Sequence, residues 1–434
     1  ACGALTPLAL WWACRPMIGS RAALVGAALL AWASWSLSMS RWAFPATLDE
    51  LLTIIAVGLT WRGLEDQISS GRRVVLLASA GLVGGMAVYA YHTGRMTPII
   101  LALLVVLRLG WDRDAWRRAL PGVMAAVLVG LLVLVPLLSF VANNWQGYNR
   151  RIDTVSLFNM QDVERRAPLL MVLNNSVPHL LMWHVRGDPN GRHHAPGAPL
   201  LDPVAGGLFA VGLGLAAARR NSTAAALLGW LVIGILPGVL SVDAPHAMRS
   251  LAAIDPACAL AGMALIRLGE LWRSPRWVQV AMPGMLGVSL LFNTWLYFSD
   301  MPQQPRVFRS FDLAASAAGR IARASATSDD SDLRSVRVFL TREMLGRSDV
   351  VRLFTSGMIP AYYDGRRFSE PPGAQALVLL GLDATDEARM AVLELLGPDA
   401  RELDPPRDPA GIPLLLAFGV GEHAERLVHS AWPP

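Results

Sequence analysis

The chain has 434 residues, of which 53% are hydrophobic and only 16% are charged. This composition excludes a purely soluble globular protein and indicates a polytopic membrane protein. The formal net charge of +5 comes entirely from arginine, because the sequence contains no lysine, and it does not point to a nucleic-acid partner. Cys2, Cys14 and Cys258 lie in apolar stretches without paired spacing, so we predict neither a disulfide framework nor a zinc site.

The first residues already belong to a hydrophobic run, and the chain starts at Ala1 rather than at methionine. This segment has neither the charged first region nor the cleavage site of a signal peptide. We therefore expect the native N-terminus to lie upstream of Ala1.

A helix that spans a bilayer needs about 20 apolar residues, and about ten stretches meet or approach this length. The predicted spans, of which the first is partial, are 2–14, 21–39, 47–64, 74–91, 97–109, 119–141, 203–218, 223–240, 250–268 and 277–298. They predict a mainly α fold, a polytopic transmembrane helix bundle over residues 1–299.

The number of arginines in each loop assigns the loops between these spans to two faces of the membrane. Most arginines fall on one face, which the positive-inside rule makes cytoplasmic. The short loops of the opposite face carry one arginine each, Arg41, Arg95 and Arg249, and the long loop 143–201 is on the same side. The span 97–109 is short, but without it the arginine-rich loops would fall outside. We expect a multi-pass protein of a bacterial plasma membrane.

Hydrophobicity falls after Phe298, and Pro302 and Pro305 mark a boundary. Residues 300–434 predict a small soluble extracytoplasmic α/β domain, built as a parallel layer. Its predicted strands are 336–340, 350–354, 376–382 and 413–418, and its predicted helices are 307–324 and 385–396. This tail contains no glycine-rich phosphate loop and no cluster of metal ligands in its sequence.

Two polar islands, 186–202 and 243–249, lie next to predicted helix ends on the extracytoplasmic face. Charged, imidazole and amide groups are costly to keep where a membrane meets water. A lipid head group that carries phosphate is a ligand that such groups could bind. Before the first island, 143–159 leads into a predicted interfacial helix, 163–183, that lies on the bilayer.

Asp49 and Glu50 form an acidic pair just inside a predicted span. The pair could bind a cation or a substrate hydroxyl, or Asp49 could cap the helix. The segment 89–98 contains Tyr89, Tyr91 and Arg95. The guanidinium of Arg95 could bind phosphate through two parallel hydrogen bonds, and the two tyrosines could add further hydrogen bonds. The alternative is that these are ordinary interfacial side chains.

His246 and Arg249 are three residues apart at a predicted helix start, where free backbone amides and an arginine make a phosphate seat. The alternative is a helix cap with a snorkelling arginine. His193 and His194 are adjacent and could bind metal only if other ligands joined them. We predict no metal site and no organic cofactor, and leave a divalent cation open.

Taken in this order and between these spans, the segments 89–98, 155–158, 186–203 and 245–250 resemble a bacterial family of membrane glycosyltransferases with the GT-C fold. This family is similar to dolichyl-phosphate-mannose protein mannosyltransferases. The resemblance covers about residues 1–300. It implies transfer of a sugar from a polyprenyl-phosphate carrier in the membrane to an extracytoplasmic glycan, lipid or protein.

Members of the fold are implied to carry a catalytic aspartate in the first extracytoplasmic loop, and we expect this chain to begin beyond that loop. Asp49 is the best acidic candidate that remains. The resemblance implies an inverting transfer, in which a carboxylate deprotonates the acceptor and cationic groups hold the leaving phosphate. For donor phosphate binding we name Arg41, Tyr89, Tyr91, Arg95, His246 and Arg249. For the loop over the acceptor we name Arg186, Asp188, Asn190, His193, Asp202 and Asp243.

Two other classes of function compete with this interpretation. A transporter or flippase for a lipid-linked solute should have ionisable residues near mid-membrane and broken helices in inverted repeats. Asp255 is the only deeply placed acid in the sequence, and no repeat is visible. A catalytically inactive scaffold that presents the outer domain would fit the absence of a first-loop aspartate.

Overall fold

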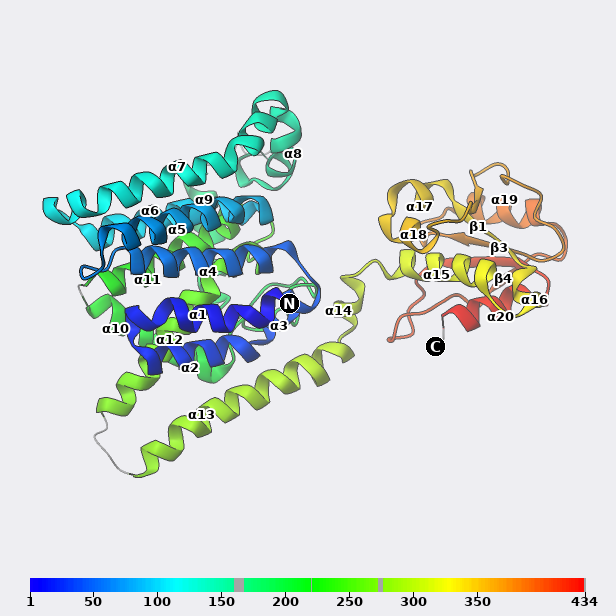
Figure 1. The fold of residues 1–434 in the computed structure, drawn as a ribbon. Coiled ribbons are helices and arrows are strands. Elements are labelled where there is room, and N and C mark those ends of the chain that lie inside the picture. Colours follow the sequence, from blue (N-terminus) through cyan, green and yellow to red (C-terminus); the bar gives the residue numbers. More distant parts are fainter. Residues whose placement is uncertain (160–167, 220, 272–275, 433–434) are drawn as a thin grey trace. The chain divides into compact units, whose positions relative to one another are not determined.

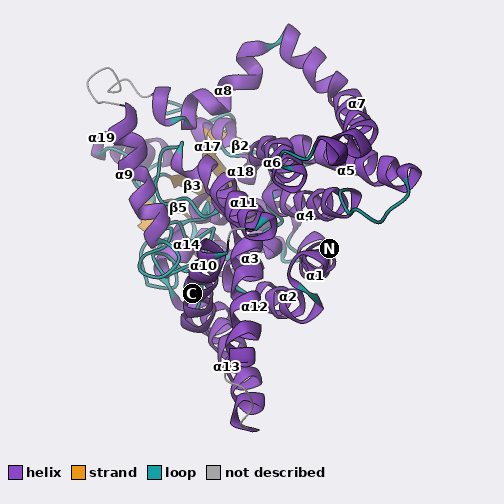
Figure 2. Ribbon diagram, turned by 90° about the vertical axis from the view of Figure 1, so that its left-hand side faces the viewer, coloured by secondary structure: helices purple, strands orange, loops and turns teal. Residues whose placement is uncertain are grey.

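The computed structural model describes residues 1–159, 168–219, 221–271 and 276–432. The chain forms two compact units, Ala1–Pro302 and Gln303–Pro434 (Figure 1). The first unit is helical over its described residues, and the named strands belong to the second unit (Figure 2). Each unit has its own hydrophobic core.

The helices of the first unit are α1 (Cys2–Ile18), α2 (Ser20–Trp32), α3 (Ser34–Arg41), α4 (Pro45–Gly63), α5 (Ser70–Ala90), η1 (His92–Met96), α6 (Thr97–Leu109), α7 (Arg113–Asn143), α8 (Trp145–Val155), η2 (Leu157–Asn159), α9 (Pro168–Leu181), α10 (Pro203–Ala218), α11 (Ser222–Val239), η4 (Met248–Ala253), α12 (Ile254–Leu271), α13 (Arg276–Trp295), η5 (Leu296–Asp300) and η6 (Met301–Gln303). They include two longer connections, 182–202 between α9 and α10 and 240–247 between α11 and η4.

Six described helices are long and apolar enough to cross a membrane, or up to seven if α2 and α3, which are bent by 58° at their junction, form one span. This is fewer than the ten spans predicted. Helices α1 and α10 stop at 17 and 16 residues, and α4 carries two acidic residues and an arginine. Helix α6 begins and ends at the predicted residues, and together with η1 it is 18 residues long.

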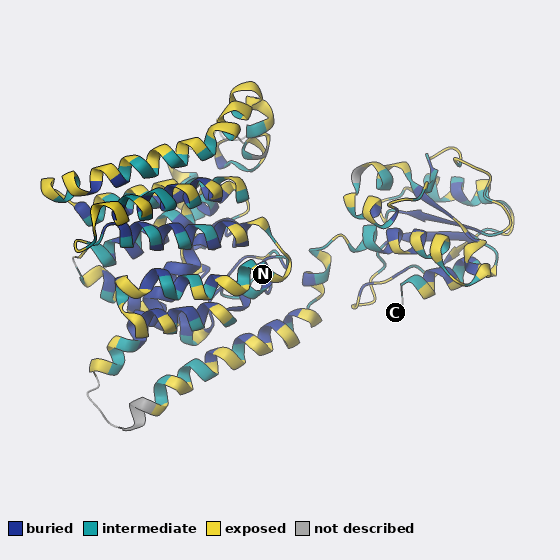
Figure 3. Ribbon diagram, viewed as in Figure 1, coloured by how far each residue is buried: buried dark blue, intermediate teal, exposed yellow. Residues whose placement is uncertain are grey.

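Close contacts between helices are made possible by glycine. A Cβ on Gly262 of α12 would lie 2.2 Å from the carbonyl oxygen of Ala22 in α2. A Cβ on Gly81 of α5 would lie 2.1 Å from the carbonyl oxygen of Ala126 in α7. Small residues are common at such interfaces in membranes, because they let two backbones approach. Figure 3 shows buried residues along inner helices of the unit such as α4. The largest fully buried side chains include Trp35, Phe209 and Trp230.

The predicted interfacial helix 163–183 corresponds to α9 from Pro168 onwards, and its first residues up to 167 lie outside the described part of the chain. From Pro168 to Leu181 helix α9 is mainly apolar, and it ends two residues before the predicted end at 183. Helix α8 precedes it and follows the long α7, so the extended loop predicted at 143–201 is partly helical.

The second unit contains a five-stranded sheet with the order β2-β1-β3-β5-β4. Its strands are β1 (Arg337–Thr341), β2 (Ala361–Tyr363), β3 (Ala376–Leu380), β4 (Arg401–Leu403) and β5 (Leu416–Val420). Strands β2, β1 and β3 run parallel, but β5 is antiparallel to both of its neighbours. The sheet is therefore mixed, and the prediction of a parallel layer is wrong for its second half.

The helices of the second unit are α14 (Pro305–Arg309), α15 (Leu313–Thr327), α16 (Ser331–Arg334), α17 (Arg342–Arg347), α18 (Asp349–Phe354), α19 (Asp386–Leu396) and α20 (Glu422–Ala431). Helices lie on both faces of the sheet. Side chains of α15 and α20 pack on one face of the sheet, and side chains of α19 pack on the other. The predicted strand 350–354 is wrong: this segment is α18, which begins where the Ser348 hydroxyl accepts a hydrogen bond from the backbone N–H of Val351.

Candidate functional site

The two polar islands meet at the carboxyl group of Asp188. One of its oxygens, Oδ2, lies 2.7 Å from Nδ1 of His193 and accepts a 2.7 Å hydrogen bond from the backbone N–H of Ala247. The other oxygen accepts a 2.8 Å hydrogen bond from the backbone N–H of Asn190. Since Ala247 belongs to the second island, this single carboxylate fixes the loop after α9 to the loop after α11.

The Asp188 carboxylate is buried, yet it is held in its charged form. Burial raises the pKa of this group, but the hydrogen bond and charge of His193 and the backbone amides of Asn190 and Ala247 outweigh burial, so the pKa is lowered overall. A buried carboxylate with several donors is a rigid anchor for the groups around it.

His246 lies against His193, with 4.7 Å between the ring centroids. Burial, and then the positive charges of His193 and Arg249, lower the pKa of His246 to about 3. Its imidazole is therefore neutral at pH 7. A neutral imidazole can donate a hydrogen bond to a phosphate, but it adds no positive charge.

Arg249 is also buried, and its guanidinium donates 2.8 Å hydrogen bonds to the Ser241 hydroxyl and to the carbonyl of Val242. The backbone amides expected to be free at this helix start are occupied. The N–H of His246 donates to Nε2 of His179, and the N–H of Arg249 donates to Nδ1 of His246 at 3.4 Å. His246 Nδ1 thus meets one backbone N–H of η4, but the N-cap residue of η4 is Ala247, and Arg249 is buried rather than snorkelling to the surface.

Asp49 lies in the second turn of α4, because this helix begins at Pro45 and its N-cap is Phe44. The alternative that Asp49 caps the helix is therefore wrong. Its buried carboxylate accepts hydrogen bonds from the Thr93 hydroxyl of η1 and, at 3.4 Å, from the Thr53 hydroxyl. These contacts orient the carboxylate toward the turn that carries Arg95.

Glu50 and Asp255 are buried beside Asp49 and close enough to interact electrostatically. The carboxyl groups of Glu50 and Asp255 are within hydrogen-bond reach of each other, and no other group of the described residues bonds to Oε1 of Glu50 or to either carboxyl oxygen of Asp255. Carboxyl groups packed together away from water need a shared proton or a cation, since their charges would otherwise repel. The sequence singled out Asp255 for its depth but did not predict that it meets the Asp49–Glu50 pair.

This acidic cluster lies next to the loop cluster. The ring of Phe44, which precedes α4, is 6.1 Å from the ring of His193. Helix α4 also contacts both η1 and η4. Residues from four distant parts of the chain therefore converge at one end of the helix bundle.

Arg95 lies on η1, and its guanidinium stacks over the ring of Tyr148 at 4.3 Å. Tyr91 packs partly buried against the core of the unit. The Tyr89 hydroxyl bonds to two backbone groups of α7. It accepts a 3.2 Å hydrogen bond from the N–H of Leu137 and donates a 2.8 Å hydrogen bond to the carbonyl of Val133. These two groups would bond to each other in a regular helix, so Tyr89 bridges α7 beside Pro136.

An apolar groove of about 410 Å³ lies between α5, α6 and α7. Gly84, Pro98, Leu101 and Leu131 are among the residues that line it. Pro98 is three residues from Arg95, so the groove extends along α6 from the turn that carries this arginine. Such a groove suits a hydrocarbon chain.

The remaining predicted residues lie at the edges or serve the fold. Arg41, Arg186 and Asp243 are exposed, and Asn190 is half-buried. Asp202 caps α10, and its second carboxyl oxygen accepts hydrogen bonds from Ser289 at 2.7 Å and Asn293 at 2.9 Å in α13. Asp202 therefore joins two helices.

Ser34, Ser289 and Asn293 were not predicted from the sequence. The side-chain oxygen of Asn293 accepts a 2.9 Å hydrogen bond from the N–H of Ser34, where α2 gives way to α3. The Ser34 hydroxyl is 2.8 Å from Nε2 of His194, and burial lowers the pKa of His194 to about 4. The sequence did contain a signal for this contact: two polar residues four positions apart, Ser289 and Asn293, in a mainly apolar helix.

A metal ion could be held by Asp188, His193 and His246, whose ligand atoms all lie within 4.8 Å of one another. Two imidazoles and one carboxylate are a donor set that zinc accepts. The carboxylate already has three donors, so a cation here would have to compete with them. From the sequence, His193 and His194 were weighed as a pair of metal ligands. In the structure, His193 lies beside His246.

No protein-family model matches the chain, and no curated protein matches it. Among solved structures, ArnT from Cupriavidus metallidurans in the apo state matches with a TM-score of 0.50 and 14% identity, over 98% of this chain and 83% of that chain. The first unit has a GT-C-like fold.

Two further matches have lower TM-scores. ArnT from the same organism bound to undecaprenyl phosphate has a TM-score of 0.47 and 14% identity, over 97% of this chain and 84% of that chain. The apo oligosaccharyltransferase from Archaeoglobus fulgidus has a TM-score of 0.43 and 15% identity, over 75% of this chain and 46% of that chain.

Proposed function

We propose that the protein is a membrane glycosyltransferase that moves a sugar from a polyprenyl-phosphate carrier to a hydroxyl group of an extracytoplasmic glycan, lipid or protein. One observation carries the proposal beyond the fold. Pro98, three residues after Arg95, lines the apolar groove, so a prenyl chain in the groove would have its phosphate near the turn that carries this guanidinium. An arginine is suited to bind a phosphate with two parallel hydrogen bonds.

In the proposed reaction, the acceptor oxygen attacks C1 of the sugar and the bond between C1 and the phosphate oxygen breaks. The acceptor proton passes to a carboxylate, for which Asp49 is the candidate. Polyprenyl phosphate leaves with the electron pair of the broken bond, and Arg95 and Arg249 stabilise its charge. Attack from the face opposite the phosphate inverts the anomeric carbon.

The other candidate residues have supporting roles in this proposal. His246 donates a hydrogen bond to the phosphate, and Tyr91 and Arg41 lie nearer its periphery. Asp188, Asn190 and His193 hold the loop over the acceptor, with Arg186 and Asp243 at its surface. Tyr89 and Asp202 act through the helices they join, since their polar groups already have protein partners.

We also propose that the shorter helices α1, α4 and α10 cross the membrane, which gives about ten crossings. With the arginine-rich loops in the cytoplasm of a bacterium, the site and the second unit are extracytoplasmic.

The test is a transfer assay with the full chain in liposomes. Undecaprenyl phosphates that carry different radiolabelled sugars are supplied, and release of undecaprenyl phosphate and transfer of label are measured. We expect Arg95→Gln to reduce release by about 100-fold or more. Arg267→Gln is the matched control, because Arg267 is an exposed arginine paired with Glu270 at the far end of α12.

The groove is tested by Ala102→Phe, since Ala102 lines it and is exposed. We expect a raised KM for the undecaprenyl donor and an unchanged KM for a donor with a two-isoprene chain. Movement of intact donor across the bilayer without release would favour the transporter class instead. Near-normal transfer by both Arg95→Gln and Arg249→Ala would refute the phosphate assignment.

A further inference from the structure

A pocket of about 440 Å³ lies at the opposite end of the helix bundle from the proposed transfer site. It is formed where α1 and α4 end and α5 begins, and these helix ends lie at the same end of the bundle (Figure 1). Helix α5 has 21 residues, which corresponds to a length of about 30 Å. The pocket is at the first turn of α5, and the turn that carries Arg95 follows its last residue.

The pocket has an excess of positive charge. Among the described residues that line it are one carboxylate, Glu65, and three arginines from three helices, Arg15, Arg62 and Arg72. The neighbouring acid, Asp66, is paired with Arg108 at 3.7 Å. Within the described part of the chain, neither Arg15 nor Arg72 forms an ion pair with an acidic side chain. The positive charge of the pocket is therefore not neutralised by these parts of the protein.

Contacts within the protein fix the guanidinium of Arg62, which is half-buried. It donates hydrogen bonds to the carbonyl of Gly58, at 3.0 Å, and to the carbonyl of Trp12, and it lies 4.0 Å over the Trp12 ring. These bonds use two of the five N–H groups of an arginine. Arg15 is close enough to Arg62 for their like charges to repel. An anion bound between them would offset this repulsion.

Helix stability explains two of these arginines but not the third. Arg15 and Arg62 lie in the last turns of α1 and α4, where a cation complements the helix dipole. Arg72 lies in the first turn of α5, where the dipole disfavours a cation. Only its backbone N–H takes part in the cap, as a donor to the Ser69 hydroxyl at 3.4 Å. An external anion would account for a guanidinium at this position.

Apolar side chains beside the arginines favour a lipid over a soluble anion. Ile68 and Leu76 belong to the lining. Arg72, Val75 and Leu82 lie on one face of α5, because they are three and seven residues apart. Val75 and Leu82 are exposed, and α5 is a candidate membrane span, so this face meets acyl chains. A lipid with its head group in the pocket would continue along this face.

We infer that this pocket binds the phosphate group of an anionic phospholipid. The arginine distribution assigns this end of the bundle to the cytoplasm, and basic pockets between helices on that side of a membrane bind such head groups. A zwitterionic head group carries a cation next to its phosphate, which the arginines would repel. The inference does not rest on the proposed transfer reaction, because none of the lining residues belongs to the transfer site.

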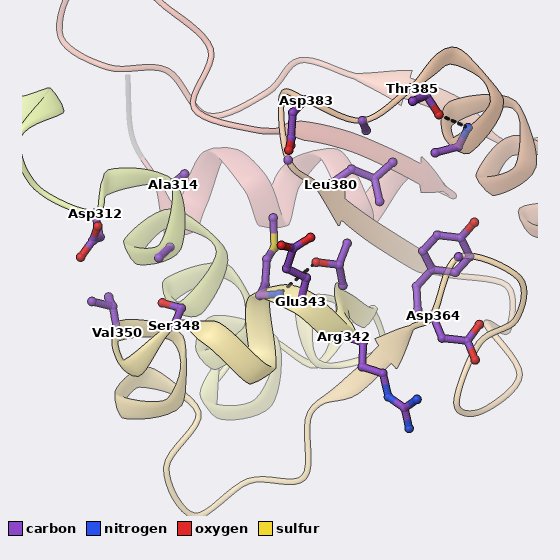
Figure 4. Close-up of a pocket in the computed structure, with 18 of the residues that line it drawn as sticks. Asp312, Ala314, Arg342, Glu343, Ser348, Val350, Asp364, Leu380, Asp383 and Thr385 are labelled. Atoms are coloured by element: carbon purple, nitrogen blue, oxygen red, sulfur yellow. Dashed lines mark hydrogen bonds between the residues drawn. The ribbon is translucent and has the colours of Figure 1, made fainter. Parts of the chain in front are cut away.

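The larger cavity of the second unit does not compete for this ligand. It measures about 950 Å³, and its described lining contains five carboxylates and one arginine. Figure 4 shows the Glu343 carboxylate near its centre and the Arg342 guanidinium directed away. Two of the five carboxylates are paired with arginines outside the lining, and the other three still outnumber Arg342. An acidic lining repels phosphate.

The test is native mass spectrometry of the full chain in detergent. Phosphatidylglycerol, phosphatidylcholine with the same acyl chains, or inorganic phosphate is titrated, and the fraction of chain with bound ligand is measured. We expect phosphatidylglycerol to bind about tenfold more tightly than phosphatidylcholine. Arg72→Gln should weaken binding of phosphatidylglycerol about fivefold, and the double variant Arg15→Gln, Arg72→Gln about 25-fold. Both arginines are exposed, so these changes are safe for folding.

Glu65→Gln separates the inference from a folding defect. It removes the carboxylate of the lining and should tighten binding of phosphatidylglycerol about threefold, whereas a damaged fold would weaken binding. Arg117→Gln is the matched control, because Arg117 is an exposed arginine near the start of α7 that pairs with Asp114 and is not part of the lining. It should leave the affinity unchanged.

Equal affinity for phosphatidylglycerol and phosphatidylcholine would overturn the inference. The same holds if Arg72→Gln loses no more affinity than Arg117→Gln, or if Glu65→Gln binds phosphatidylglycerol no more tightly than the native chain. Saturable binding of inorganic phosphate without a preference for phosphatidylglycerol would identify a soluble anion as the occupant, and the lipid assignment would then be wrong.

Discussion

Asp188 connects two loops that are 59 residues apart in the sequence at the nearest contact, the hydrogen bond from Ala247. Composition identified both loops as polar islands at helix ends, and it identified their histidines and arginines. It could not identify the contact, because the pairing of a carboxylate with a distant backbone amide leaves no periodic pattern. The same reason explains why Phe44 and His179 were missed beside His193 and His246.

Replacing Asp188 with asparagine should loosen both loops. The charged hydrogen bonds to His193 and Ala247 become weaker, and the amide group presents a donor where the native oxygen accepts. We expect the free energy of unfolding to fall by about 1.5–3 kcal/mol. Thermal unfolding in detergent checks this, with Asp243→Asn as the control, since Asp243 is exposed. Equal melting temperatures for the two variants would contradict an anchoring role.

Tyr89 and α7 give the first prediction at the level of elements. Tyr89→Phe leaves the carbonyl of Val133 and the N–H of Leu137 without the bridging hydroxyl, at a cost of about 1–3 kcal/mol. In a Pro136→Ala background the helix can close this bond itself, so the same change should cost much less. Unfolding of the two single variants and the double variant in nanodiscs measures the difference. Additive effects would argue against the bridge.

The turn after β4 gives a prediction with a pH dependence. The buried Asp408 carboxylate accepts 2.9 Å hydrogen bonds from the backbone amides of Ala410 and Ile412 and a 3.2 Å bond from Arg309. Burial raises the pKa of Asp408, but the hydrogen-bond donors lower the pKa by more than burial raises it, so the pKa is lowered overall. The charged Asp408 carboxylate therefore stabilises the fold fully above about pH 4, which is the pKa of an aspartate in the unfolded chain. This stabilisation is lost as the pH falls through the pKa of Asp408 in the folded protein.

Hydrogen exchange of the peptide 404–414 measures this effect after correction for intrinsic rates. At pH 7, Asp408→Asn should exchange faster than the native chain, and the two should converge below about pH 4. Asp404→Asn is the control, because Asp404 forms an exposed ion pair with Arg407 and such pairs contribute little. Slower exchange in Asp408→Asn at neutral pH would refute the expectation.

Long apolar runs allowed several helices to be predicted closely, as α6 illustrates. Short elements were harder. The segment 350–354 begins with two valines and was predicted as a strand, but it belongs to the short helix α18, which starts after the Ser348 cap and carries the exposed Arg352. The antiparallel β5 was assigned to a parallel layer, because alternation of strands and helices does not specify direction when a long connection precedes the strand.

At the scale of the whole molecule, the arginine distribution predicts which face each loop occupies. A single cysteine at Glu370 in the second unit should react with a membrane-impermeant maleimide in intact cells. A single cysteine at Gln67, in the turn between α4 and α5, should react only after permeabilisation. Both residues are exposed, Cys2 is replaced with serine in both variants, and Cys14 and Cys258 are buried, so the introduced cysteine is the one that the reagent can reach. The reverse pattern would invert the proposed topology.

Helix α13 completes a set of hydrogen bonds that begins in the first helices of the chain. The side chain of Asn293 accepts a hydrogen bond from the N–H of Ser34 and donates one to the Asp202 carboxylate. Ser289 donates a second hydrogen bond to the same carboxylate. A fragment that ended after α12 would leave these groups without partners inside an apolar core. The smallest piece of this protein that can be engineered as a catalyst therefore has to extend through α13, even though that helix contributes no residue to the proposed chemistry.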